Sequence, residues 1–180
     1  EYYRDSNKIV CNSHPALEYK EPKLLDKDNL TDFFGNMVHE YVHQCNLQKT
    51  PPEQSQNMEA VKNRIQVTIA SMWIVEQQPG EYNPIHTHTN CDISTVMFLK
   101  APIFLPSEKT KRDDDGTIYF IGSSSPKGKL KTNSLKVKPT PGAFFIFPSH
   151  LQHTVYPYKT NDNFARRSVS FNAEFDEEKT

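Results

Sequence analysis

The sequence predicts an α+β domain that is mainly β, in which one or two N-terminal helices pack on a sandwich or barrel of short strands. Two observations carry this prediction. A helical period of apolar residues runs from residue 30 to residue 45, and from residue 64 onward the apolar residues follow the alternating pattern of strands. A helix followed by many short strands is typical of this class. A chain of 180 residues can bury one core, so we expect residues 1–180 to form a single domain.

Residues 1–63 are predicted to form an N-terminal arm and helices. The polar stretch 1–27 either pairs at a sheet edge or wraps the domain. The clearest helix follows, with Asp28 near its start as a candidate cap, and the segment 49–54 (KTPPEQ) ends it. A weaker helical pattern covers 55–63. The periodic apolar residues of the main helix are Leu30, Phe33, Phe34, Met37, Val38, Tyr41, Val42 and Cys45.

Residues 64–173 are predicted to form the β core, and the tail after it is expected to be solvated. Turn-rich segments such as PGEYNP, DDDG and GSSSPKG separate the apolar runs. The predicted strands cover residues 65–75, 93–99, 117–121, 134–138, 143–147 and 166–172.

Composition excludes some partners and locations. The net charge of −1 gives no electrostatic reason to expect nucleic acid or an anionic membrane as a partner. Cys11, Cys45 and Cys91 lack the spacing of a metal site and cannot all pair, which favours a reducing, cytoplasmic location. No apolar run approaches the roughly 18 residues of a membrane span or resembles a signal peptide. The sequence leaves the oligomeric state open.

Three histidines form a candidate metal site. His86 and His88 lie one residue apart after a turn, and in an extended segment such residues point to the same side. His153 follows the apolar strand at 143–147, which must be buried. Neutral imidazoles bind Fe, Zn, Cu or Ni, and three of them leave coordination positions open. The alternative is a surface turn whose histidines are merely solvated.

An arginine near the C-terminus is a candidate anion site. In the run RRSVSFN, Arg166, Ser168 and Ser170 alternate with Arg167, Val169 and Phe171. If the apolar pair packs against a helix, Arg166 and Ser168 point into the barrel. A buried guanidinium needs an anion, and beside a hydroxyl it suits a carboxylate. The alternative is an exposed Arg166, with Arg167 in a surface ion pair.

The order of these motifs resembles the Fe(II)/2-oxoglutarate-dependent oxygenases, in particular a family of small oxygenases of bacteria and their viruses within the prolyl-hydroxylase-like superfamily. The resemblance covers about residues 64–173. Each motif is weak alone, and the ordered set is specific. The matching residues are Trp73, Tyr82, Asn83, His86, His88, Ser94, Val96, Leu99, Pro141, Gly142, Phe147, Pro148, Ser149, Leu151, His153, Val155, Pro157, Arg166, Ser168, Phe171 and Asn172.

The resemblance implies a double-stranded β-helix, or jelly roll, that holds one Fe(II) and uses 2-oxoglutarate as cosubstrate with O2. By position, His86 and His153 match the two histidine ligands of the family. His88 takes the place that is Asp or Glu in most of the superfamily, and Asp92 is the alternative third ligand. The implied reaction is a hydroxylation of a peptide, protein or small molecule.

The resemblance also assigns the cosubstrate side of the site. Arg166 and Ser168 match the positions that bind the distal carboxylate of 2-oxoglutarate, and Asn83 is placed to hydrogen-bond the cosubstrate or the substrate. The candidate supporting residues are His150, Asp92 and Trp73. The polar loops between Pro102 and Pro141 are expected to frame the substrate entrance.

Two alternative interpretations, one of the same histidines and one of a second motif, remain open at this point. The histidine spacing also fits the cupin pattern, which would give a metal-dependent dioxygenase or binding protein without 2-oxoglutarate, but it does not explain Arg166 and Ser168. His39, Glu40 and His43 form an H-E-x-x-H sequence on the main helix, as in zinc metalloproteases. The helical period places these three residues on the polar side of the helix, where solvated side chains are common.

Overall fold

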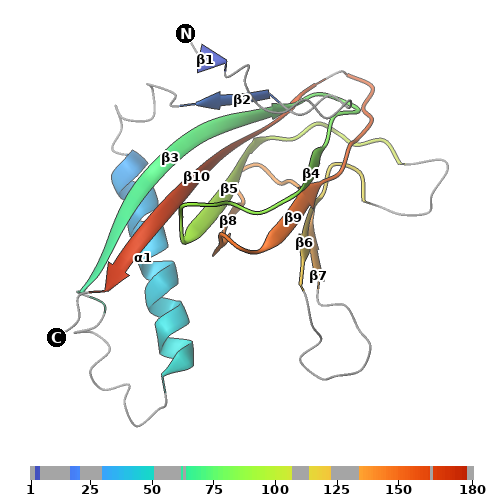
Figure 1. The fold of residues 1–180 in the computed structure, drawn as a ribbon. Helices are drawn as coiled ribbons and strands as arrows, with labels where there is room; N and C mark the ends of the chain where they lie inside the picture. Colours follow the sequence, from blue (N-terminus) through green and yellow to red (C-terminus); the bar gives the residue numbers. More distant parts are fainter. Residues whose placement is uncertain are drawn as a thin grey trace, which may run out of the picture.

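The protein consists of two antiparallel sheets and one long helix in the residues that the structure describes (Figure 1). The computed structural model describes residues 3–4, 17–20, 30–50, 62, 64–106, 114–122, 134–162 and 164–177. The larger sheet has the strand order β1-β2-β3-β10-β5-β8, and the smaller sheet has the order β4-β9-β6-β7. The elements are β1 (Tyr3–Arg4), β2 (Leu17–Lys20), α1 (Leu30–Lys49), β3 (Ile65–Gln77), β4 (Asn83–His86), β5 (Ile93–Lys100), β6 (Ile118–Ile121), β7 (Ser134–Val137), β8 (Phe144–Pro148), β9 (Gln152–Val155) and β10 (Arg166–Glu177).

Helix α1 covers the outer face of the larger sheet (Figure 1). Its residues Phe34, Val38 and Val42 recur every four positions and are buried, so they form one apolar stripe. The ring of Phe34 lies 5.0 Å from that of Phe171 on β10 and 5.6 Å from that of Phe144 on β8. The predicted main helix is confirmed, and its candidate cap Asp28 lies outside the described residues.

A second core lies between the two sheets. The larger sheet contributes Val96 and Phe98 from β5 and Phe147 from β8, and the smaller sheet contributes Ile118, Phe120 and Val155. The strand β5 is thus covered on both faces, and its residues from Ile93 to Phe98 are buried or half-buried. The interval between the sheets also holds the site described below.

The six predicted strands are confirmed, and the last of them extends further than predicted. The predicted strand at 166–172 continues as β10 to Glu177, which is paired with Ile65 of β3. The residues of β10 after Ala173 are exposed, apart from the half-buried Phe175, as expected for the tail. A bulge between Asn172 and Ala173 adjusts the register and lets the pairing continue. Because β3 has 13 residues, it supplies partners along the whole length of β10.

Other elements were not resolved by the sequence pattern. The N-terminal arm pairs at a sheet edge through β2 and β3, which was one of its two predicted arrangements. Strands β4 and β9 were not predicted as strands, because each has only four residues and β4 contains Pro84. The weaker helix predicted over 55–63 lies almost wholly outside the described residues. The single-domain organisation of residues 1–180 stays a prediction.

Within the described ranges, no helix combines the length and the apolar character needed to cross a membrane.

Candidate active site

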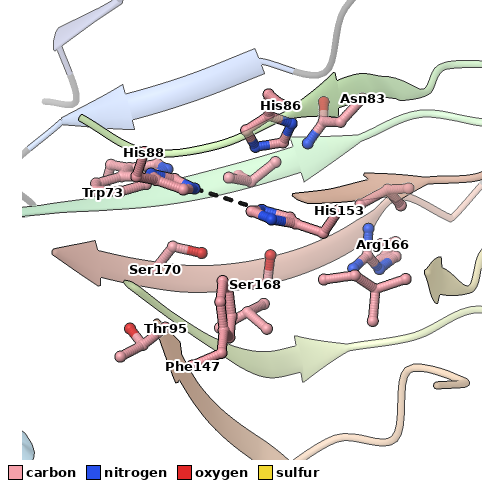
Figure 2. A pocket seen from close by; sticks show the side chains of 14 residues that line it. Trp73, Asn83, His86, His88, Thr95, Phe147, His153, Arg166, Ser168 and Ser170 are labelled. Carbon is pink, nitrogen blue, oxygen red and sulfur yellow. Dashed lines mark hydrogen bonds between the residues drawn. The ribbon is translucent and has the colours of Figure 1, made fainter. Parts of the chain in front are cut away.

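Three histidines meet between the two sheets (Figure 2). His86 ends β4 and is paired in register with His153 of β9, and His88 follows two residues after His86. One ligand nitrogen from each of the three rings lies within 4.8 Å of the others. The Nε2 atoms of His88 and His153 are 3.4 Å apart. Two neighbouring ligands about 2.1 Å from a metal ion are separated by roughly 3 Å, so these rings need little movement to share one ion.

Loop contacts, rather than strand pairing, position His88. The strand β4 ends at His86, and the backbone N–H of His88 donates to the carbonyl of Ser149, at 2.9 Å. The hydroxyl of Ser149 in turn donates to the carbonyl of Cys91, at 2.7 Å. The loop after β8 therefore holds the loop that carries His88. The ring of Trp73, on β3, stacks on His88 at a centroid distance of 5.8 Å and an interplanar angle of 27°.

Backbone carbonyls fix the tautomers of two of the rings. Nδ1 of His153 lies 2.9 Å from the carbonyl oxygen of Leu151, and Nδ1 of His86 lies 2.7 Å from that of Pro84. A carbonyl oxygen only accepts, so each Nδ1 carries a proton, and the tautomer that this favours in a neutral ring has its lone pair on Nε2. Burial lowers the pKa of His153 to about 4, which keeps its ring neutral at pH 7, the form that binds metals.

A buried cation shares the pocket with these histidines (Figure 2). The side chains of Arg166, Ser168 and Ser170 line it from one face of β10, and Arg166 is only 2% exposed. Its Nη1 donates to Oε1 of Gln77 at 2.7 Å, and its guanidinium lies 4.9 Å from the centroid of the Phe98 ring. Burial lowers the pKa of Arg166 to about 10, so the group is still charged at neutral pH.

The residues present fit a metal ion and an anionic cosubstrate. The Nε atom of Arg166 is buried without a hydrogen-bond partner, and no salt bridge to Arg166 occurs among the described residues. A buried cation of this kind requires an anion, and its free donor edge suits a carboxylate. The histidines at the other end of the pocket supply three nitrogen ligands, a set that suits iron and other first-row metals.

Comparisons with known proteins identify the family. Residues 71–172 match the model of a family described as “Putative 2OG-Fe(II) oxygenase”, which is more than half of the 180-residue chain. The chain belongs to this family. It is an Fe(II)- and 2-oxoglutarate-dependent oxygenase by membership, and the family implies both the metal and the cosubstrate. No protein of curated function matches the sequence significantly.

Similar solved structures include three oxygenases, of which the first supports the fold. An oxidoreductase of the 2OG-Fe(II) oxygenase family from Burkholderia pseudomallei is 14% identical, with a TM-score of 0.53, over 96% of this chain and 72% of that one. A prolyl-4-hydroxylase from Pseudomonas putida is 14% identical over 93% of this chain and 79% of its own, with a TM-score of 0.49. A viral collagen prolyl hydroxylase from Paramecium Bursaria Chlorella virus-1 is 14% identical over 89% and 79%, with a TM-score of 0.48. The first likeness shows that the fold is the double-stranded β-helix.

The structure brings some predicted site residues of the oxygenase together and leaves others apart. Asn83 and Trp73 line the pocket with the three histidines. Asp92 does not belong to the histidine cluster, and its exposed carboxylate accepts the N–H of Phe175 at 3.1 Å. His150 is exposed and does not line the pocket. Of the two candidates for the third ligand position, only His88 is near the other two histidines. Much of the region between Pro102 and Pro141 lies outside the described residues.

Several residues of the pocket were missed by the sequence analysis. Gln77, Thr95 and Ser170 were not proposed, although Thr95 and Ser170 line the pocket and Gln77 holds Arg166. The sequence did contain one indication of Gln77. Trp73, Val75 and Gln77 lie two positions apart on β3, so their side chains share one face of the strand. A glutamine on the inward face of a strand is buried, so its amide needs hydrogen-bond partners, and this makes it a candidate site residue.

Two residues of the helix motif His39, Glu40 and His43 contact Lys62. The Nε2 atom of His39 donates to the carbonyl of Lys62 at 3.0 Å, and Glu40 bridges to Nζ of Lys62 at 3.0 Å. His43 was expected on the solvated face of the helix, but its side chain is only 6% exposed. Among the described residues, these three do not form a group close enough for a metal.

Proposed function

We propose that the oxygenase holds Fe(II) on His86, His88 and His153, binds 2-oxoglutarate through Arg166 and Ser168, and hydroxylates a peptide, protein or small-molecule substrate. One observation carries this proposal: three imidazoles converge at one end of a pocket whose other end holds a buried, charged guanidinium without a carboxylate partner. A ligand that chelates a metal at one end and carries a carboxylate at the other matches both ends.

Each group has a distinct task in this proposal. The carbonyls of Leu151 and Pro84 keep the Nε2 atoms of His153 and His86 unprotonated and aimed at the metal position. Arg166 and the hydroxyl of Ser168 would hold the distal carboxylate and so fix the distance between the two ends of the cosubstrate. When bound, Fe(II) would supply the activation of O2 that no side chain can provide.

The apolar walls and the positive charge of the pocket support these assigned tasks. Apolar side chains from both sheets line it and limit the entry of water, namely Val75, Val96, Ile118, Phe147 and Val155. Because all three proposed ligands are neutral, the metal would keep its full double charge, and Arg166 adds another. A dianionic cosubstrate balances this charge better than a monoanionic one.

Metal binding can be tested without turnover, because Trp73 is the single tryptophan and stacks on His88. Anaerobic addition of Fe(II) is expected to quench its fluorescence with a stoichiometry of one. His153→Ala should weaken binding by at least about a hundredfold, since even the outer partners of metal ligands are worth ten- to a hundredfold. The matched control is His150→Ala, an exposed histidine three residues away, which should bind Fe(II) like the wild type.

Cosubstrate binding is tested next, by adding 2-oxoglutarate to the anaerobic Fe(II) protein. Chelation by a 2-oxo acid produces a weak metal-to-ligand charge-transfer band in the visible range, and admission of O2 should then yield succinate. Iron binding without this band would contradict the use of 2-oxoglutarate and favour a cupin-type site. Absence of iron binding would contradict the proposed metal ligands.

A further inference from the structure

The hydrogen-bond partner of Arg166 is the neutral amide of Gln77, although a carboxylate would compensate the charge of a buried guanidinium. Arg166 and Gln77 are paired in register on β10 and β3, and both side chains are fully buried or nearly so. Their contact joins Nη1 to Oε1 at 2.7 Å. A carboxylate at this position would neutralise the buried cation. The amide accepts one hydrogen bond and leaves the positive charge uncompensated.

The orientation of the Gln77 amide is fixed on its other side. Its Nε2 donates to the carbonyl of Glu81 at 2.5 Å and to that of Tyr156 at 3.1 Å. Both donor positions of the NH2 group are therefore used, and a flipped amide would place its oxygen against two carbonyl oxygens. Only the oxygen is left to face Arg166.

Tyr158 ties the two backbones together next to this contact. Its hydroxyl accepts the N–H of Arg166 at 2.9 Å and donates to the carbonyl of Gln77 at 2.7 Å. The ring of Phe104 packs edge-on against Tyr158, with centroids 5.0 Å apart. Because the backbone of both residues is held, the amide determines where the guanidinium lies. Its one bond engages Nη1, and the Nε atom keeps no partner.

We propose that Gln77 is the positioning residue that makes the pocket select a dicarboxylate: it orients Arg166 through one hydrogen bond and, being neutral, leaves the charge for the distal carboxylate of the cosubstrate. This inference rests on the proposed function. Substitution of the amide by a carboxylate of the same shape would supply an internal anion that competes with the ligand. Gln77 does not touch the metal position, so the 2-oxo acid end should be unaffected.

The test compares two ligands that share the metal-chelating end. 2-Oxoglutarate carries the distal carboxylate and 2-oxobutyrate lacks it, and both are titrated anaerobically into the Fe(II) protein through the charge-transfer band. The wild type is expected to prefer 2-oxoglutarate by about ten- to a hundredfold, the worth of hydrogen bonds to a charged group. Gln77→Glu should reduce this preference at least about tenfold and leave the affinity for 2-oxobutyrate unchanged.

A neighbouring residue supplies the matched control. Gln78→Glu adds the same charge one position away, at a half-buried side chain that bonds to Glu76, and should keep the wild-type preference. Gln77→Met is the second variant, and it removes the acceptor without adding charge. It should also lose affinity for 2-oxoglutarate selectively, by a smaller factor than Gln77→Glu. If Gln77→Glu fails to fold by circular dichroism, the selectivity of Gln77→Met decides.

The outcomes separate this inference from the proposed function. A preference that survives both Gln77 variants, or an equal loss of both ligands, would show that Gln77 has only a structural role. A wild type that binds Fe(II) but shows no band with 2-oxoglutarate would contradict the proposed function itself. A selective loss for the dicarboxylate confirms the inference.

Discussion

Arg166 and Arg167 are consecutive residues of β10 with opposite surroundings. Arg166 faces the pocket, is 2% exposed and has an amide and an aromatic ring as its partners. Arg167 is exposed and forms a hydrogen-bonded ion pair with Glu76 on β3. An exposed pair of this kind contributes little to stability, whereas a buried cation without an anion is costly to the fold. The buried Arg166 lowers the stability of the fold, so its presence is best explained by a function in ligand binding.

The same contrast extends along the strand. Val169 and Phe171 point toward α1 and belong to an apolar core, while Ser168 and Ser170 point into the pocket. Because successive side chains of a strand alternate, one stretch of sequence builds both the core and the site. Each face can therefore be changed separately, and substitutions on the two faces should have different consequences.

The largest expected effect on stability comes from the core face. Phe171→Ala removes a fully buried ring that packs on Phe34 and Phe144, so it should lower the free energy of unfolding by about 3–5 kcal/mol. Denaturant unfolding followed by circular dichroism measures this. Ser170→Ala, the neighbour on the pocket face, is the control and should change stability by no more than about 1 kcal/mol. Equal effects of the two substitutions would contradict the division between the faces.

Substitution of Arg166 is expected to raise the stability of the protein and to lower its affinity for 2-oxoglutarate. Arg166→Met replaces an uncompensated buried cation by an apolar chain of similar length, so the metal-free protein should become more stable by about 1–3 kcal/mol. The same variant should bind 2-oxoglutarate at least about thirtyfold more weakly, because a buried charge pair is lost, and should bind Fe(II) normally. Unfolding curves and the anaerobic titration measure the two quantities. A destabilised variant would show that Arg166 is mainly structural.

Sequence reasoning reached the parts of the site that depend on local patterns. Strand alternation, a property of a single segment, left two arrangements of β10 open, and the structure has the one in which Val169 and Phe171 pack on a helix and Arg166 and Ser168 face inward. The order of the histidine and arginine motifs was sufficient to suggest the family, which the family match confirms.

The remaining parts depend on contacts between distant segments. The side chain of Gln77 forms hydrogen bonds with Tyr156 and Arg166, which lie 79 and 89 residues further along the chain. No local sequence pattern predicts these contacts. The short strand β4 exists because β9 pairs with it. His43 was placed on a solvated face because the helical period describes only the helix, and a side chain off the main apolar stripe can still be buried by the rest of the protein.

The smallest effect is expected for the outward-facing arginine. Arg167→Ala removes the exposed ion pair with Glu76, which should change the free energy of unfolding by less than about 1 kcal/mol, with the difference shrinking further at high salt. Its affinities for Fe(II) and 2-oxoglutarate should equal those of the wild type, because its side chain lies on the other face of β10 from the pocket. The measurement is the same pair of experiments used for Arg166→Met. Since both variants remove one positive charge from adjacent positions, a loss of 2-oxoglutarate binding in both would mean that general attraction by positive charge, and not a directed contact from Arg166, holds the cosubstrate.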